Sequence, residues 1–456
     1  MALQKIFGLT MLQCLGLTAI PLGLALAGPA WAQDTSGASG AQPGAHPSVQ
    51  PVGQDASPRP WYALGMMPDP ILDQVLLFYL SEARHGMTDI GEVLDTAGRV
   101  RADDELSWTH EWFKTAERVR AMAEEGERKG HPLGAGAAYL RAAAYYRAAL
   151  HRHPEPSAPE IRQMAEKEVG AYTRAIKLLS FPAQPVRIPY EGTTLPGYFF
   201  RSTRSAKKAP LLIVHQGRDA WAEDETYIAQ EALARGWHCL LVDGPGMGQT
   251  LRLQGLAFRP DWEKVITPVV DFAVRQPGVD SSRIALMGLS MGGALVPRAA
   301  SFEKRLKLLV VNPGVYEWSR IVTGFIEERF PQIADLPEKD PEGFNALMNK
   351  VIEENPFMRW GMRDTMWKHG CTTPAQLFVE LKRYTNRGRA EKITAKTLVI
   401  DGEAEEFGQA KELYDALRCP KDYLLFTVRE TAQLHVQTGA TAVANQRIFD
   451  WLEENL

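Results

Sequence analysis

Cysteine is scarce in this chain, and its scarcity argues against two kinds of cross-linked architecture. The 456 residues hold four cysteines. Cys14 lies in an apolar N-terminal run, and the other three, Cys239, Cys371 and Cys419, are far apart in sequence and odd in number. Such spacing predicts neither a disulfide framework nor a zinc ribbon.

The chain also has little net charge and only one long apolar run. Its formal net charge is -4, and charges of both signs are interspersed, so we expect no nucleic-acid partner. Residues 6–28 form the long apolar run. Beyond that run the sequence predicts no integral membrane span.

The N-terminal run has the features of an export signal. Lys5 precedes it, and the small-x-small sequence Ala30-Trp31-Ala32 follows it, directly before Gln33. A retained membrane anchor is the alternative, but glycine and proline interrupt the run. We expect residues 1–32 to be a cleaved signal peptide and the protein to be exported, either periplasmic or secreted. Residues 33–64 are rich in Gly, Pro, Ser and Ala, which predicts a disordered linker.

Two patterns divide the remaining residues. From 65 to 182, apolar residues recur at helical spacing between Pro and Gly breaks, which predicts a helical cap domain of four or five helices. From 183 to 456, short Val, Leu and Ile runs alternate with helix-length segments, which predicts an α/β domain with a mostly parallel sheet and helices on both faces. The alternation breaks at about 316–392, where helix-like pieces and a Trp/Met-rich stretch predict a helical lid insertion.

The stretch GLSMGG indicates a nucleophile elbow at Ser290. It follows the strand-like run RIALM and opens a helix-like run, GGALVPRAAS. A sharp turn between a strand and a helix needs small neighbours and exposes the serine hydroxyl at the edge of the sheet. In this context the motif predicts that Ser290 is the nucleophile.

A serine nucleophile needs a base and an acid, and the chain offers both in the order Ser, acid, His that this fold uses. Of the ten histidines, His435 alone lies beyond the last strand-like run, so it is the predicted base. Glu405, three residues after Gly402 in TLVIDGEAEEFG, fits the loop position of the acid best. Glu317, past the preceding strand, is the alternative acid.

An oxyanion formed on attack would need two preorganised amide donors. The first is the amide of Met291, directly after the nucleophile. The second comes from the loop PLLIVHQGRDAW, where the amide of either Gly217 or Arg218 is the candidate. His215 in the same loop is expected to support the backbone, because no second ligand stands at metal spacing.

Several segments together resemble one branch of a known superfamily. They are HQGRDAWAEDE, VDGPGMGQT, GLSMGG, DGEAEEFGQAKELYDAL and the ending LLFTVRETAQLHVQTGA with QRIFDWLEENL. The branch is that of the α/β-hydrolase superfamily that includes 2,6-dihydropseudooxynicotine hydrolase and the FrsA-like esterases. The resemblance covers roughly residues 65–456, and it implies an N-terminal helical cap and a triad on Ser290, Glu405 and His435. The branch usually has aspartate where this chain has Glu405.

The resemblance implies hydrolysis of esters or of carbon-carbon bonds beside a ketone, without a metal or organic cofactor. We expect an exported serine hydrolase acting on a small or medium organic substrate with an ester or activated carbonyl. The alternatives are a carbon-carbon bond hydrolase and, in another class, a non-catalytic binding protein on a hydrolase scaffold. Candidate substrate contacts at the start of the lid are Tyr316, Glu317 and Trp318. A homodimer is compatible with these sequence features.

Overall fold

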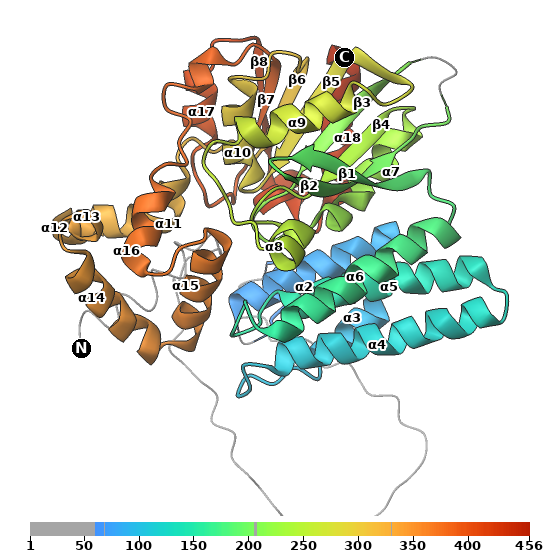
Figure 1. Cartoon of the computed structure of the whole chain (residues 1–456), viewed down its shortest axis with the longest axis horizontal. Helices are drawn as coiled ribbons and strands as arrows, with labels where there is room; N and C mark the ends of the chain where they lie inside the picture. The colour runs from blue at the N-terminus through green and yellow to red at the C-terminus, as the bar shows by residue number, and fades with distance from the viewer. Residues whose placement is uncertain (1–59, 68, 205–207, 330) are drawn as a thin grey trace, which may run out of the picture.

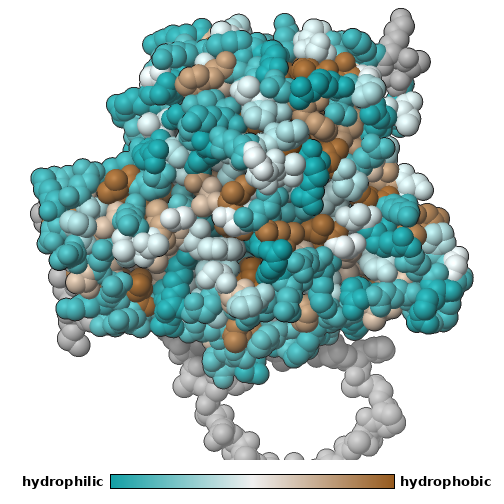
Figure 2. All heavy atoms as spheres, viewed as in Figure 1, coloured by the Kyte–Doolittle hydropathy of each residue, from teal (hydrophilic) through white to brown (hydrophobic). Residues whose placement is uncertain are grey.

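The computed structural model describes residues 60–456, apart from 68, 205–207 and 330. The expected signal peptide and residues 33–59 of the expected linker lie outside the described residues. Within the described part of the chain, no helix is long and apolar enough to cross a membrane. On the face shown in Figure 2, the surface is mostly hydrophilic, with apolar residues scattered across it.

The N-terminal part of the described chain is a set of packed helices. Their bounds are α2 (Pro70–Glu82), η1 (Ala83–His85), α3 (Ile90–Ala97), α4 (Ser107–Arg128), α5 (Pro132–Leu150) and α6 (Pro159–Leu178). α5 packs between α4 and α6 (Figure 1). Its alanine-rich sequence suits that central position, because small side chains let neighbouring helices approach on both sides. Tyr139, Tyr145 and Tyr146 on α5 are buried in this core.

The rest of the chain is built on an eight-stranded sheet. Its strands are β1 (Ala183–Tyr190), β2 (Thr193–Phe200), β3 (Ala209–His215), β4 (His238–Val242), β5 (Val279–Leu289), β6 (Leu308–Asn312), β7 (Lys396–Gly402) and β8 (Lys421–Phe426). The order is β1-β2-β4-β3-β5-β6-β7-β8. The pairs β1/β2 and β2/β4 are antiparallel, and the others are parallel. The predicted mostly parallel sheet is confirmed.

Helices cover both faces of the sheet, as predicted, and alternate residues of the strands show it. Leu212 and Val214 of β3 share a core with α7 (Thr226–Ala234) and α18 (Thr441–Asn455). Leu211 and Ile213 of the same strand share a second core with α9 (Glu263–Ala273) and α10 (Gly292–Ala300). This alternation follows from the two-residue period of a strand. The remaining elements of this part are η2 (Ala222–Glu225), α8 (Gly248–Gln254), α17 (Ala410–Ala416), η4 (Val428–Glu430) and η5 (His435–Gln437).

Between β6 and β7 the chain forms a group of helices that projects from the sheet domain (Figure 1). These are α11 (Trp318–Arg329), α12 (Pro331–Ala334), α13 (Leu336–Lys339), α14 (Pro341–Glu354), α15 (Pro356–Lys368), α16 (Pro374–Leu381) and η3 (Ala390–Lys392). The Trp/Met-rich stretch noted in the sequence forms α15, whose first turn is capped by the side chain of Asn355. This segment occupies the place of the lid insertion expected at about 316–392.

A buried charge cluster joins the N-terminal helices to the sheet domain. Arg147 on α5 donates to Glu168 on α6 at 2.6 Å and to Asp224 in η2 at 2.5 Å. The side chains of Arg147 and Glu168 are fully buried, and that of Asp224 is 3% exposed. A guanidinium shared by two buried carboxylates fixes the relative position of the two parts of the chain.

We expect the substitution Arg147→Ala to lower the free energy of unfolding by about 3–5 kcal/mol, because it leaves two buried carboxylates without a cation. Urea unfolding followed by circular dichroism measures this change. The matched control is Arg128→Ala, which removes the exposed partner of Glu125 on α4 and should cost less than about 1 kcal/mol. Equal losses for the two variants would contradict a stabilising role for the buried cluster.

Candidate active site

Ser290 lies in the sharp turn between β5 and α10, in a strained backbone conformation. Its φ is +53°, a left-handed value that few non-glycine residues adopt. A Cβ atom at Gly288 would lie 2.4 Å from the carbonyl oxygen of Gly292, and one at Gly293 would lie 1.9 Å from that of Pro313. The glycines around Ser290 are therefore required by crowding, which is the feature expected of a nucleophile elbow.

The structure brings Ser290, His435 and Glu405 together in hydrogen-bonded order. His435 Nε2 lies 2.9 Å from Ser290 Oγ, and His435 Nδ1 lies 2.8 Å and 3.0 Å from the two carboxylate oxygens of Glu405. Glu405 lies 115 positions after Ser290 in the sequence, and His435 lies 145 positions after it. The three residues nevertheless meet at the carboxyl ends of β5, β7 and β8. The arrangement can remove the serine proton and hold the imidazole in one orientation.

The loop around Glu405 holds this carboxylate in place. The side chain of Glu405 is only 2% exposed, and it accepts a hydrogen bond from the amide of Phe407 at 3.1 Å. The amide of Ala404 donates to the carbonyl of Gln433 at 3.0 Å, which ties the acid loop to the histidine loop. The extra methylene of glutamate, relative to the aspartate usual in the resembling branch, is thus accommodated within a well-bonded loop.

The electrostatic environment favours a charged His435. Burial lowers the pKa of His435, but the carboxylate of Glu405, helped by Glu406 and Asp219, outweighs burial and raises this pKa above its ordinary value of 6.5. The ring of Phe407 packs against the imidazole with 4.6 Å between centroids. An imidazolium formed when His435 accepts a proton would therefore be stabilised by the carboxylate beside it.

Glu317, the alternative acid, and Asp401, at the end of β7, are bound elsewhere. Glu317 accepts from Arg387 at 3.0 Å and also lies against Arg320. Asp401 accepts from the Tyr423 hydroxyl at 2.6 Å and from the amide of Gly402 at 2.9 Å. Among the described residues, His435 Nδ1 is bonded to no carboxylate other than that of Glu405. The geometry favours Glu405 over Glu317 as the partner of the histidine.

The predicted amide donors lie around Ser290. Met291 directly precedes α10, so its N–H belongs to the positive end of that helix. Gly217 lies so close that a Cβ atom there would be 2.5 Å from Ser290 Cβ. No acceptor within the described ranges forms a hydrogen bond with the amides of Met291, Gly217 or Arg218. All three amides are therefore without an acceptor in the described part of the chain, and the choice between Gly217 and Arg218 stays open.

The side chain of Arg218 ties the loop of these amides to the lid. Its guanidinium donates to Asp364 at 2.5 Å and to Thr365 at 2.9 Å, both on α15. Lys368 on the same helix pairs with Asp219 at 2.5 Å and with Asp364 at 2.9 Å. The position of the loop beside Ser290 therefore depends on the lid helix.

The candidate substrate contacts at the start of the lid are closely packed. Trp318 is 2% exposed, and its ring lies edge-on to Phe407 at 5.6 Å, so one aromatic ring separates it from His435. Tyr316 is 8% exposed, and its amide donates to Gln409. The structure does not bring Glu317 to the serine. The burial of Tyr316 and Trp318 indicates a packing role for both side chains.

Sequence reasoning missed a pair of buried amides that joins the serine and histidine loops. Asn312 donates to the side chain of Gln437 at 2.7 Å and accepts from it at 3.2 Å. The carbonyl of Asn312 also accepts the N–H of Ser290 at 2.7 Å. No local motif marks either residue. The signals that could have identified them are a polar side chain at the end of a buried strand, Asn312, and another two residues after the base, Gln437.

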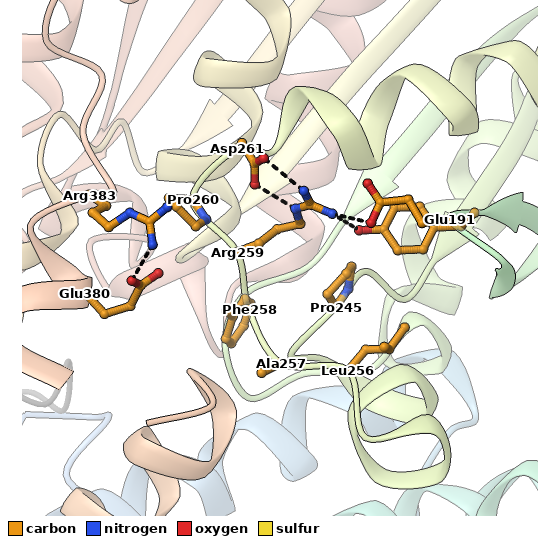
Figure 3. Close-up of a pocket in the computed structure, with 11 residues that line it drawn as sticks. Glu191, Pro245, Leu256, Ala257, Phe258, Arg259, Pro260, Asp261, Glu380 and Arg383 are labelled. Atoms are coloured by element: carbon orange, nitrogen blue, oxygen red, sulfur yellow. Dashed lines mark hydrogen bonds and ion pairs between the residues drawn. The ribbon is translucent and has the colours of Figure 1, made fainter. Parts of the chain in front are cut away.

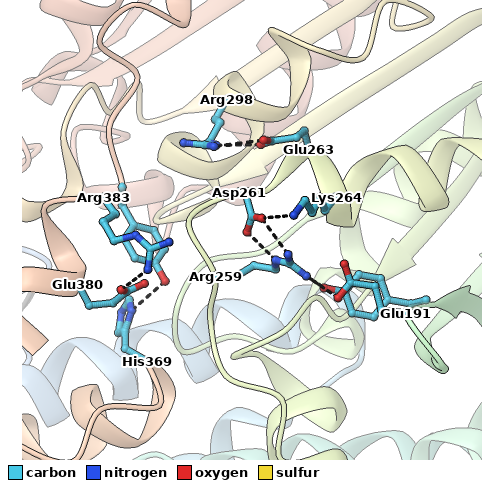
Figure 4. A network of polar contacts seen from close by, with 11 residues as sticks. Glu191, Arg259, Asp261, Glu263, Lys264, Arg298, His369, Glu380 and Arg383 are labelled. Carbon is cyan, nitrogen blue, oxygen red and sulfur yellow. Dashed lines mark hydrogen bonds and ion pairs between the residues drawn. The ribbon is translucent and has the colours of Figure 1, made fainter. Parts of the chain in front are cut away.

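Two other depressions contain none of the residues predicted for the site. One, of about 390 Å³, is lined by residues that include Tyr190, Phe258 and Arg259 (Figure 3). Its charged groups pair with each other, since Arg259 bonds to Asp261 and Glu191 (Figure 4). The other, of about 830 Å³, is lined only by residues of the lid.

No cluster within the described residues has the composition of a metal site. His215 is buried, and its Nε2 accepts from the indole N–H of Trp262 at 3.2 Å. Burial lowers the pKa of His215 to about 4. The imidazole is engaged in supporting the loop beside Ser290.

Comparison with known proteins gives matches along nearly all of the described chain. The model of a family described as "Alpha/beta hydrolase family" matches residues 211–443, and one described as "Esterase FrsA-like" matches residues 60–317. The chain is 30% identical over 411 residues to "Hydrolase LUC6" of Fusarium sp, which covers 85% of this chain and 97% of that relative.

A second relative and a solved structure extend the comparison. The chain is 31% identical over 386 residues to "20-hydroxy-prefusarin hydrolase FUS2" of Gibberella moniliformis, covering 80% of this chain and 91% of the relative. The crystal structure of a 2,6-dihydroxy-pseudo-oxynicotine hydrolase is similar with a TM-score of 0.64 and 18% identity, covering 83% of this chain and 95% of that one. At 18% identity the structural match shows a similar fold and no more than that.

Proposed function

This chain belongs to the α/β-hydrolase family and is a hydrolase, and from that premise we propose that it is an exported serine hydrolase of esters or activated carbonyls in small or medium organic substrates. The observation that carries this proposal is the chain of hydrogen bonds from Ser290 through His435 to Glu405. The strained turn at Ser290 and the three available amides beside it support the same chemistry.

In the proposed reaction, His435 Nε2 takes the proton of Ser290 as Oγ attacks the substrate carbonyl. The amide of Met291, together with that of Gly217 or Arg218, stabilises the oxyanion. Glu405 stabilises the imidazolium, which then protonates the leaving group as the acyl-enzyme forms. Water, activated by His435, releases the acid and restores Ser290.

Export is part of the proposal and rests on the sequence of residues 1–32. A positively charged start, an apolar run and a small-x-small site in that order are features of cleaved signals. Amino-terminal sequencing of the exported protein tests it, with Gln33 as the expected first residue and Met1 as the contradicting result.

A substrate screen tests the class of reaction. We expect purified protein to hydrolyse short aryl esters, with an initial burst of phenol if deacylation limits turnover. The screen should include aryl esters, lactones and β-diketones. Cleavage of the β-diketones without any turnover of esters would contradict the ester proposal and favour carbon-carbon bond hydrolysis.

The raised pKa of His435 predicts the shape of the pH profile. His435 must be neutral to accept the serine proton, so kcat/KM should rise with pH as His435 loses its own proton. Because Glu405 raises the pKa of His435, the midpoint of this limb should lie above 6.5 in the free enzyme. Initial rates on an aryl ester between pH 4 and pH 10 measure it. A midpoint below 6.5 would contradict the assigned environment of His435.

A further inference from the structure

Arg252 on α8 is a partly buried cation without an ion-pair partner among the described residues. Its guanidinium lies over the ring of Trp221 at 4.8 Å and over that of Trp367 at 5.8 Å. Its Nε is buried and has no hydrogen-bond partner, and Nη1 reaches only a carbonyl of its own helix, that of Gly248, at 3.5 Å. No acidic side chain in the described part of the chain forms an ion pair with it.

Two of the carboxylates that act on Arg252 are already bound by other cations. Asp219 pairs with Arg218 and Lys368, and Asp364 pairs with the same two residues. Asp243, which also acts on Arg252, accepts hydrogen bonds only from uncharged groups of Gln216, Ala222 and Gln249, and burial raises its pKa to about 8. Asp243 is therefore largely uncharged near neutral pH and does not balance the guanidinium. Burial lowers the pKa of Arg252, with Asp364 and Asp219 acting in the opposite direction. An arginine stays protonated in spite of such a change, so the site keeps a positive charge.

Arg252 lies beside the candidate active site. Asp219 follows Gly217, which contacts Ser290, by two residues. The carboxylate of Asp219 is close enough to His435 to raise its pKa, and it acts in the same direction on Arg252 and on His151. Asp219 keeps 36% of its side-chain exposure and His435 keeps 24%. Solvent therefore reaches both side chains.

Three parts of the chain meet at this place. His151 directly follows α5 of the N-terminal helices, Arg252 belongs to α8, and Lys368 ends α15 of the lid. Figure 1 shows α8 between the sheet and the N-terminal helices. Arg162 on α6 donates to the carbonyl of Leu253 at 2.8 Å, which holds α8 against those helices.

We propose that Arg252, together with His151, forms a subsite that binds a carboxylate of the substrate beside Ser290. This inference rests on the proposed function, because it places the anion on the molecule that Ser290 attacks. A planar guanidinium with unoccupied N–H groups matches a carboxylate in a two-pronged hydrogen bond. A partly buried cation without an ion-pair partner loses part of its hydration, and a bound anion would offset that cost.

His151 adds a second donor from the cap side. Its ring lies edge-on to Tyr79 at 5.9 Å and makes no hydrogen bond to any described residue. Burial lowers the pKa of His151 in spite of Asp219 and Asp224, so near neutral pH the imidazole is uncharged and carries one N–H. Arg252 supplies the charge of the subsite, and His151 can orient the anion.

Two pairs of test esters locate the carboxylate on either side of the scissile bond. One pair is mono-p-nitrophenyl glutarate and its methyl ester, with the charge on the acyl side. The other is 4-carboxyphenyl butyrate and its methyl ester, with the charge on the leaving group. Binding to the Ser290→Ala variant gives Kd without turnover, and initial rates of the unsubstituted protein give kcat/KM.

We expect the anionic member of at least one pair to bind more tightly than its methyl ester. Arg252→Gln in the Ser290→Ala background should reduce that preference by about 10- to 100-fold, because one charged hydrogen bond contributes a factor of this size to affinity. The control is Arg235→Gln in the same background, because Arg235 also stacks on a ring, that of Phe449, at 4.8 Å. This control should keep the preference.

Equal binding of both members in both pairs, or a preference that survives Arg252→Gln, would overturn the subsite. A loss of affinity for charged and neutral esters alike would also overturn it, because it would show that Arg252 only supports the two tryptophans. These results are independent of the proposed function, which fails instead if the unsubstituted protein hydrolyses none of the four esters.

Discussion

Ser290→Ala should lower kcat on a short aryl ester by about 10⁴- to 10⁶-fold, because the variant loses the atom that forms the acyl-enzyme. The fold should persist, since Ser290 Oγ bonds only to His435 among the described residues. Alanine also keeps the Cβ atom that contacts Gly217. Steady-state kinetics and circular dichroism of the purified variant measure both expectations.

The matched control for this variant is Ser301→Ala. Ser301 directly follows α10, and its hydroxyl donates to the carbonyl of Arg298 at 2.7 Å, so it lies one helix length from the reacting atoms. Its removal should change kcat by less than about threefold, as expected for a hydrogen bond outside the site. Turnover by Ser290→Ala comparable to that of the control would exclude Ser290 as the nucleophile.

Glu405→Gln should lower kcat by about 10³- to 10⁴-fold. A glutamine amide can present an N–H to His435 Nδ1, which would favour the tautomer that cannot accept the serine proton. The negative charge that raises the pKa of His435 is lost at the same time. The acidic limb of the kcat/KM profile should therefore move to lower pH, in contrast to a purely structural defect, which would leave its midpoint in place.

Glu317→Gln is the matched control for the acid. Glu317 bonds to Arg387 and Thr385 at the start of the lid, so its loss should leave the midpoint unchanged and reduce kcat by less than about tenfold. If Glu317→Gln caused the larger loss and moved the pH profile, the alternative acid considered from the sequence would be the correct one.

The sequence predicts the parts of this site that depend on local pattern and chain order. The turn at Ser290 follows from glycines within three positions of it. His435 follows from its place after the last strand, and Glu405 follows from its place after β7. The mostly parallel sheet with helices on both faces follows from alternating strand and helix periods, and it is confirmed. α3 has only eight residues, so its apolar positions cover little more than two turns.

The parts that sequence reasoning missed depend on contacts between distant segments. Arg218 and Asp364 are 146 positions apart, and Asn312 and Gln437 are 125 positions apart. No spacing rule links such pairs, because their proximity arises only when the lid and the loops fold against the sheet. Arg252 could not be identified from the sequence for the same reason, because its lack of an ion-pair partner depends on side chains from distant segments.

Covalent labelling of Ser290 is the most direct test of the proposed chemistry. A fluorophosphonate probe should add one probe mass to the purified protein, and peptide mapping should place it on Ser290. The Ser290→Ala variant should remain unlabelled under the same conditions. Folded protein that stays unlabelled, or a label on another residue that persists in the variant, would contradict the assignment of Ser290 as an activated nucleophile.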